Sequence, residues 1–315
     1  MLDVISITLP IFILISLGFA STRLGVTTRE DIRALGAFVI RFALPALIFK
    51  SLSQRPFAEI ANADYLIAYT VGSGVVFATM FALARVLQPG GVAANAMAAL
   101  GSSSSNSGFI GYPVALMFVG PSAGLALALS MITENVVVIP LALTLAESGR
   151  HAGKSLPQVF AHLVGRLVGN PMFVGIALGA AASLSGLRLP GPLDKSIDML
   201  SLTSGALALF AVGGALVGLS LGGVWRDVAR IVVGKLILHP LAILAASLIL
   251  APRLDPNLRK SMLIFASAPM LSIYPLLGRR YGQEQVAAAS LLVATTLSFL
   301  TMSTLLLALS WLAPG

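Results

Sequence analysis

The sequence predicts an all-α integral membrane protein with ten transmembrane helices, arranged as two inverted repeats of five helices each. Of the 315 residues, 57% are hydrophobic and only 10% are charged, whereas soluble domains carry roughly 25% charged residues. Apolar runs of about 20 residues, the length that spans a bilayer core of about 30 Å, follow one another along the chain. Short motifs of the first half also return in the second half at a nearly constant offset.

Ten apolar runs are long enough to span a membrane. They cover about residues 3–22, 32–53, 63–87, 94–119, 121–146, 160–185, 196–221, 229–251, 259–278 and 284–312. The connections are short, and the longest, 147–158, separates a first repeat (residues 1–150) from a second (residues 151–315). Five spans in each half is an odd number, so the second half must enter the membrane from the opposite side. Such inverted repeats are typical of secondary transporters.

Two pairs of motifs indicate that the halves are related. The pattern PxFxxxxLG begins at Pro10 and again at Pro171, an offset of 161 residues. Tyr112-Pro113 returns as Tyr274-Pro275, an offset of 162 residues. Because the two offsets differ by only one residue, we interpret the motifs as traces of an internal repeat.

The fourth and ninth spans are predicted to be broken. The fourth contains GSSSSNSGFIGYPVALMFVG (101–120), in which serines and Asn106 compete for backbone hydrogen bonds and Pro113 lacks an amide proton. Pro269 and Tyr274-Pro275 interrupt the ninth span in the same way. Irregular backbone survives in a bilayer only inside protein or beside water, so paired breaks indicate a transporter's binding site. The alternative is a kinked but continuous helix that packs through small residues.

The breaks predict a site for an anion. Each half-helix that begins near a Tyr-Pro pair directs backbone N–H groups and a positive dipole end into the protein. The predicted substrate-binding residues are Asn106, Ser104, Ser105, Ser107, Tyr112, Pro113, Pro269, Tyr274 and Pro275.

Glu134 is the only acidic residue deep within a predicted span. A carboxylate there is costly unless it is protonated, paired or bound to a cation, so Glu134, with Thr133 and Asn135 beside it, is the candidate site for proton or sodium coupling. The alternative is a structural hydrogen bond between helices.

Basic residues within spans are further candidates for charged partners of the substrate or of an acidic residue. Arg41 lies mid-span and can pair with an acid or attract the anion, whereas Lys50 lies nearer a span end and can extend to the interface. His239 shares a helix face with Lys235, four residues earlier, and is either a proton relay or a hydrogen-bonded interior residue.

Several functions lack the sequence features they need. The chain has no cysteine, no phosphate-binding GxxxxGK[ST] loop, no metal-binding HExxH pattern and no GxSxG nucleophile motif. These observations argue against an enzyme, an ATP-driven pump and a metal cofactor. The net charge of +8 comes from loops, so we interpret it as a topology signal rather than a nucleic-acid site. Loops after odd-numbered spans carry ten Lys and Arg against six after even-numbered spans, which predicts cytoplasmic odd-numbered loops and both termini on the outer side.

The motifs also resemble those of a known family. LPIFILISLGF in the first span, NSGFIGYP in the fourth, Asn170-Pro171 in the sixth and SAPMLSIYP in the ninth are similar to the auxin efflux carrier family, whose bacterial members include malonate and other organic-acid permeases. The resemblance implies a scaffold domain, a transport domain with crossing fourth and ninth helices, an elevator-like motion and homodimers. It identifies Pro113 and Pro275 as the crossover prolines and Asn106 as a substrate-contacting residue. The long central loop of plant members is absent, so auxin is not implied as the substrate.

The sequence therefore predicts a secondary transporter for a small organic anion, a mono- or dicarboxylate such as malonate, in the inner (plasma) membrane. Two alternatives remain: a sodium-coupled symporter of the bile-acid type, and a receptor that binds its ligand without moving it.

Overall fold

The computed structural model describes residues 2–87, 91–148, 169–187, 189–219 and 224–312, and within these ranges the chain is helical without strands. The first half forms α1 (Leu2–Arg23), α2 (Arg29–Phe38), α3 (Leu44–Ser53), α4 (Phe57–Ile60), α5 (Ala63–Leu87), α6 (Gly91–Ser103), α7 (Tyr112–Val119), α8 (Ser122–Thr133) and α9 (Ile139–Ser148). The second half forms α11 (Pro171–Ser185), α12 (Gly191–Ala215), α13 (Trp225–Val233), α14 (His239–Leu250), α15 (Pro256–Ser267), α16 (Tyr274–Arg280) and α17 (Glu284–Leu312). The loop 147–158 falls mostly outside the described residues, as does the predicted start of the sixth span.

Seven helical stretches among the described residues are long and apolar enough to cross a membrane. They are Ile5–Arg23, Arg29–Ser53, Phe57–Leu87, Ser122–Ser148, Gly191–Ala215, Trp225–Leu250 and Glu284–Trp311. The other three predicted spans correspond to shorter helices: the interrupted pairs α6/α7 and α15/α16, and α11. Large apolar side chains such as Leu202, Ile249 and Trp311 lie on the surface, as expected of a multi-pass membrane protein whose outer face contacts lipid.

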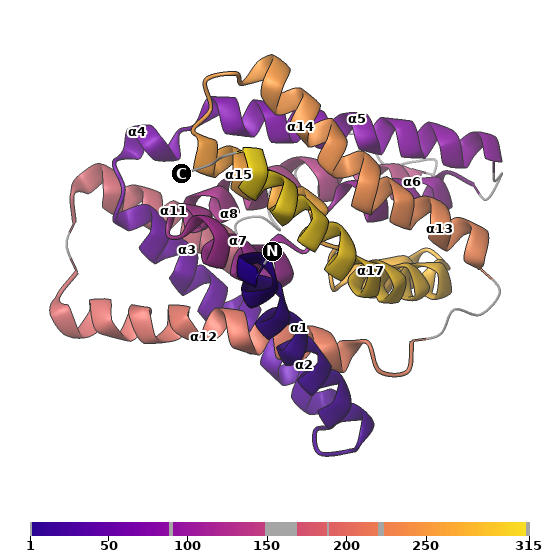
Figure 1. The fold of residues 1–315 in the computed structure, drawn as a ribbon, viewed down its shortest axis with the longest axis horizontal. Helices are drawn as coiled ribbons and strands as arrows, with labels where there is room; N and C mark the ends of the chain where they lie inside the picture. The colour runs from indigo at the N-terminus through magenta and orange to yellow at the C-terminus, as the bar shows by residue number, and fades with distance from the viewer. Residues whose placement is uncertain (1, 88–90, 149–168, 188, 220–223, 313–315) are drawn as a thin grey trace.

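The helices pack as two groups (Figure 1). In the first group, α1 and α2 pack on α12, and α3 packs on α11. In the second group, α5 packs on α6 and α14, α8 on α15, and α17 on α13 and α16. The two groups meet where α3 contacts α8 and where α1 contacts α7 and α17. Each group therefore combines helices from both halves of the sequence.

Glycines set the closest helix contacts of the first group. A Cβ atom at Gly18 of α1 would lie 2.0 Å from the carbonyl oxygen of Phe210 on α12, and one at Gly179 of α11 would lie 3.1 Å from that of Phe49 on α3. Gly18 and Gly179 are the matching glycines of the repeated PxFxxxxLG motif. Small residues allow helix backbones to approach in a membrane, so the repeated motif has the same packing role in both places.

Within the described ranges, four wide π-helical turns interrupt the helices: η1 (Val39–Ala43), η2 (Ser107–Gly111), η3 (Glu134–Val138) and η4 (Gly234–Leu238). Each ends two residues before a proline, namely Pro45, Pro113, Pro140 or Pro240. A proline inside a helix offers no amide proton and clashes with the carbonyl four residues earlier. The wider turn lets the residue before each proline bond five residues back, as His239 N does to Gly234 O. Turns of this kind are frequent at functional sites.

Candidate functional site

The two predicted breaks meet inside the second helix group. The chain is irregular between α6 and η2, and again between α15 and α16. The backbone N–H of Asn106 donates to the carbonyl oxygen of Pro269 at 2.7 Å, and the Asn106 side-chain amide donates to Ser272 Oγ at 2.6 Å. Irregular backbone from one half therefore supplies hydrogen-bond partners to irregular backbone from the other half, which satisfies polar groups that would be costly in lipid.

A cavity of about 100 Å³ lies beside this crossing, large enough for a small molecule or a few waters. Its polar lining comes from Ser105, Asn106, Ser107, Glu134, Asn135 and Ser272. Its apolar lining includes Leu44 of α3 and Met172 of α11. The cavity thus lies between the two helix groups, with most of its polar side chains on the second group.

Glu134 is buried next to the first break. Its Oε1 accepts hydrogen bonds from Ser107 Oγ at 2.7 Å and Ser105 N at 3.2 Å, and the Tyr69 hydroxyl lies 3.4 Å away. Its Oε2 has no hydrogen-bond partner among the described residues. One carboxylate oxygen thus holds the break in place, while the other is buried without a hydrogen-bond partner among the described residues.

A buried lysine lies on the other side of Ser105. The Lys235 ammonium donates to Ser105 Oγ at 2.7 Å, to Ala266 O at 2.8 Å and to His239 Nδ1 at 2.7 Å. His239 Nε2 lies 3.0 Å from Ser73 Oγ, and a charged ammonium on Lys235, which uses all three of its protons in this arrangement, would place the ring proton on this nitrogen.

The opposite charges of the site are connected through one serine. The ion pairs among the described residues do not include Glu134 or Lys235. Instead, the Ser105 backbone N–H donates a hydrogen bond to Glu134, and the Ser105 hydroxyl oxygen accepts one from Lys235. The position of the first break is therefore tied to both charges.

Some of the remaining predicted site residues belong to the cluster around Ser105, Glu134 and Lys235, and others lie elsewhere. Pro269 accepts the hydrogen bond from Asn106, whereas the Ser104 hydroxyl donates to Leu100 O of its own helix at 2.6 Å. Thr133 bonds Thr70 at 3.0 Å, away from the carboxylate of Glu134. Asn135 lines the cavity and bonds Met131 O at 2.9 Å.

The aromatic and basic predicted residues are placed differently. Tyr112 and Pro113 begin α7 and line a separate, larger cleft. Tyr274 is buried and donates to Met97 O at 2.8 Å, and Pro275 lies in the first turn of α16. His239 is part of the cluster, whereas Arg41 is exposed and takes no part in it.

Sequence reasoning left Lys235, Tyr69 and Ser73 out of the site. A basic residue far from either end of an apolar stretch, on the same helix face as a histidine, was the available signal for Lys235. Nothing in the sequence indicated that Tyr69 and Ser73 of α5 face this cluster.

Comparisons with known proteins decide the family. The model of a family described as membrane transport protein matches residues 3–307. The chain belongs to this family. The match confirms the resemblance to auxin efflux carriers and supports a membrane transporter rather than an enzyme.

Three relatives match over nearly their whole length. A protein of Rhizobium meliloti (strain 1021) named "Putative malonate transporter" is 32% identical over 97% of this chain and 96% of its own. "Uncharacterized transporter YfdV" of Escherichia coli (strain K12) is 25% identical over 94% of each chain. "Uncharacterized transporter MJ1031" of Methanocaldococcus jannaschii is 27% identical over 94% of this chain and 96% of its own.

Proposed function

We propose that this chain is a secondary active transporter that carries a small organic anion, a mono- or dicarboxylate such as malonate, across the inner (plasma) membrane. The observation that carries the proposal is the contact of Asn106 with Pro269 and Ser272, where two broken helices meet beside a small polar cavity. The name of the Rhizobium relative agrees with this substrate class.

The crossing supplies what an anion needs. Helices η2 and α7 form one continuous helix that begins at Ser107 beside the cavity, and the start of a helix carries partial positive charge and unpaired N–H groups. The Asn106 amide and the Ser272 hydroxyl add donors at the same point. A carboxylate can therefore be bound without a permanent positive side chain in direct contact.

Coupling to protons follows from the position of Glu134. A substrate carboxylate in the small cavity would lie beside the free Oε2, and two like charges at close range oppose each other. Protonation of Glu134 removes this repulsion, so anion and proton enter together. The Lys235 amine lies on the other side of Ser105 and donates to its hydroxyl, so a basic group stands close to the site without contacting the substrate.

Transport by an elevator-like motion agrees with the packing. The α1–α12 and α3–α11 contacts are exchanged when the first five predicted spans are matched with the second five, as an inverted repeat requires. In this reading the first helix group is the scaffold, and the second, which holds the crossing and both buried charges, moves against it.

A ligand-dependent thermal-shift measurement tests the proposal. Purified protein is heated with malonate, acetate or a bulky steroid-like anion, with and without sodium, at pH 5.5 and pH 7.5. A ligand that binds the folded state raises the melting temperature by mass action. We expect stabilisation by a short carboxylate, stronger at the lower pH and independent of sodium; dependence on sodium would indicate the sodium-coupled alternative.

A substitution at the crossing makes this measurement specific. Asn106→Ala removes the donor to Ser272 and should abolish the shift caused by the carboxylate, while Asn257→Ala, an exposed residue near the start of α15, should leave it unchanged. Counterflow of the same anion in proteoliposomes then separates a transporter from a receptor that only binds. An unchanged affinity in Asn106→Ala would place the site elsewhere.

A further inference from the structure

A second, larger cavity lies outside the site described above. This cleft has a volume of about 740 Å³ and lies between α1, α3, α7 and α12. Its lining includes Lys50, Arg55, Tyr112, Pro113, Met117 and Ser204. Tyr112 and Pro113 follow directly after η2, whose other end lines the small cavity, so one π-helical turn separates the two cavities.

The cleft extends along α7 to a loop. Helix α7 runs from Tyr112, one π-helical turn after the first break, to the turn at Gly120, and both Tyr112 and Pro121 line the cleft. On the opposite wall, α3 ends at Ser53, and the loop after it contributes Gln54, Arg55 and Pro56. The cleft therefore runs from the loop surface to the start of α7, one π-helical turn away from the crossing.

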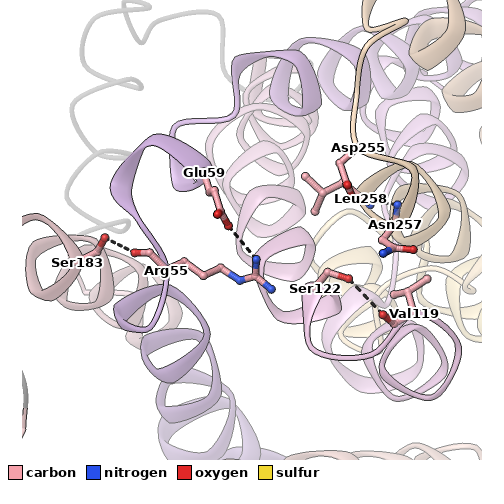
Figure 2. Close-up of polar contacts among 8 residues, drawn as sticks. All are labelled: Arg55, Glu59, Val119, Ser122, Ser183, Asp255, Asn257 and Leu258. Carbon is pink, nitrogen blue, oxygen red and sulfur yellow. Dashed lines mark hydrogen bonds and ion pairs between the residues drawn. The ribbon is translucent and has the colours of Figure 1, made fainter.

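Two basic side chains line the outer part of this route. The Lys50 ammonium forms an ion pair with Asp198 of α12, and the two side chains are 30% and 34% exposed. Arg55 donates to Glu59 at 2.9 Å, and Figure 2 shows its side chain extending from the loop toward the turn that carries Val119 and Ser122. Both cations are paired but accessible, unlike the enclosed Lys235.

We propose that this part of the cleft is an anion-binding site that captures a small carboxylate before it reaches the crossing, with Lys50 at its centre. The carboxylate takes the place of Asp198 on the ammonium, so Lys50 keeps a negative partner throughout, while the displaced Asp198 side chain, 34% exposed, is hydrated instead. Charges in a cleft with low-dielectric walls concentrate oppositely charged ligands, and Arg55 adds to the attraction. The proposal rests on the proposed function for the identity of the anion, but not for the existence of the site.

Thiol labelling tests the capture site without requiring transport. The chain has no cysteine, so Met117→Cys places a single thiol in the cleft, at a side chain that is 47% exposed. The measured quantity is the rate of reaction with an anionic methanethiosulfonate (ethylsulfonate) divided by the rate with its cationic trimethylammonium analogue. Val86→Cys, at the end of α5 and outside the cleft, provides the reference thiol.

We expect Lys50→Met to lower this ratio for the cleft thiol about fivefold or more and Asp198→Asn to raise it, with no change for the reference thiol. Lys260→Met removes the same charge near the start of α15, away from the cleft lining, and should have no effect. Malonate should slow labelling of the cleft thiol and lose this protection in Lys50→Met. A ratio that does not respond to Lys50, or responds equally to Lys260, overturns the proposal.

The labelling result separates this inference from the proposed function. If Lys50→Met leaves the ratio unchanged while Asn106→Ala abolishes the thermal shift, the capture site is wrong and the transporter stands. If the ratio depends on Lys50 but no carboxylate stabilises the wild-type protein, the cleft binds anions and the proposed substrate class is wrong.

Discussion

The electrostatic connection between Lys235 and Glu134 can be measured directly. Lys235→Met removes three hydrogen bonds, of 2.7, 2.8 and 2.7 Å, from a fully buried ammonium. Removing one member of a buried charged network costs about 3–5 kcal/mol. Because Glu134 and Lys235 do not form a direct ion pair, their charges attract each other by less than about 4 kcal/mol at an effective dielectric constant of about 20.

A double-mutant cycle isolates this attraction. Lys235→Met, Glu134→Gln and the double variant are unfolded reversibly in mixed detergent micelles, and the three changes in unfolding free energy are compared. We expect the double variant to be more stable than the sum of the single changes by at least about 1 kcal/mol. The same cycle with Lys50→Met, whose ion pair lies in the large cleft, is the control and should be additive. Additivity in both cycles would refute the idea that Ser105 connects two charges.

Three further predictions concern coupling, packing and helix shape. Glu134→Gln imitates the protonated acid, so carboxylate uptake, which should fall as pH rises in the wild type, should become independent of pH; a retained profile assigns Glu134 a structural role. Gly213→Ala places a Cβ 1.8 Å from a carbonyl oxygen of α1 and should lower the unfolding free energy by about 1–3 kcal/mol, whereas Gly36→Ala, with open space around it, should be neutral or stabilising. Pro240→Ala removes the proline that accompanies η4, and a regular helix in its place would rotate Lys235 by about 100° about the helix axis. We expect this variant to fold but to lose carboxylate binding in the thermal-shift assay. The control is Pro10→Ala, in a helix without a π-helical turn, which should retain binding.

Local chemistry made the membrane class and the breaks predictable. Apolar runs identify spans because every side chain that contacts the lipid tails has to be apolar. The breaks at Asn106 and Pro269 were visible because serine, glycine and proline act on the backbone of their own segment. The π-helical turns end two residues before Pro45, Pro113, Pro140 and Pro240, but a proline alone does not predict such a turn, because Pro10 lies inside α1 without one.

The partners within the site could not be predicted, because they come from distant segments. Glu134 stood out as a deep acidic residue, but the cation that accompanies it lies on another span, about a hundred residues later in the chain. Ser104 and Ser105 are chemically identical neighbours, yet one bonds its own helix and the other joins Glu134 to Lys235. Only the direction of each side chain at the end of α6 distinguishes them.

The placement of charges on the two helix groups suggests how capture and transport are linked. Lys50 and Asp198 belong to the first group, whereas Glu134, Lys235 and the crossing belong to the second. Under the proposed mechanism the second group moves against the first, so the distance from the capture site to the crossing changes during each cycle. An anion released by Lys50 to the crossing would leave Lys50 paired again with Asp198, which lowers the chance that the anion returns. The loss of Asp198 should therefore strengthen anion capture and slow its transfer to the crossing, so that Asp198→Asn combines faster anionic labelling with slower uptake.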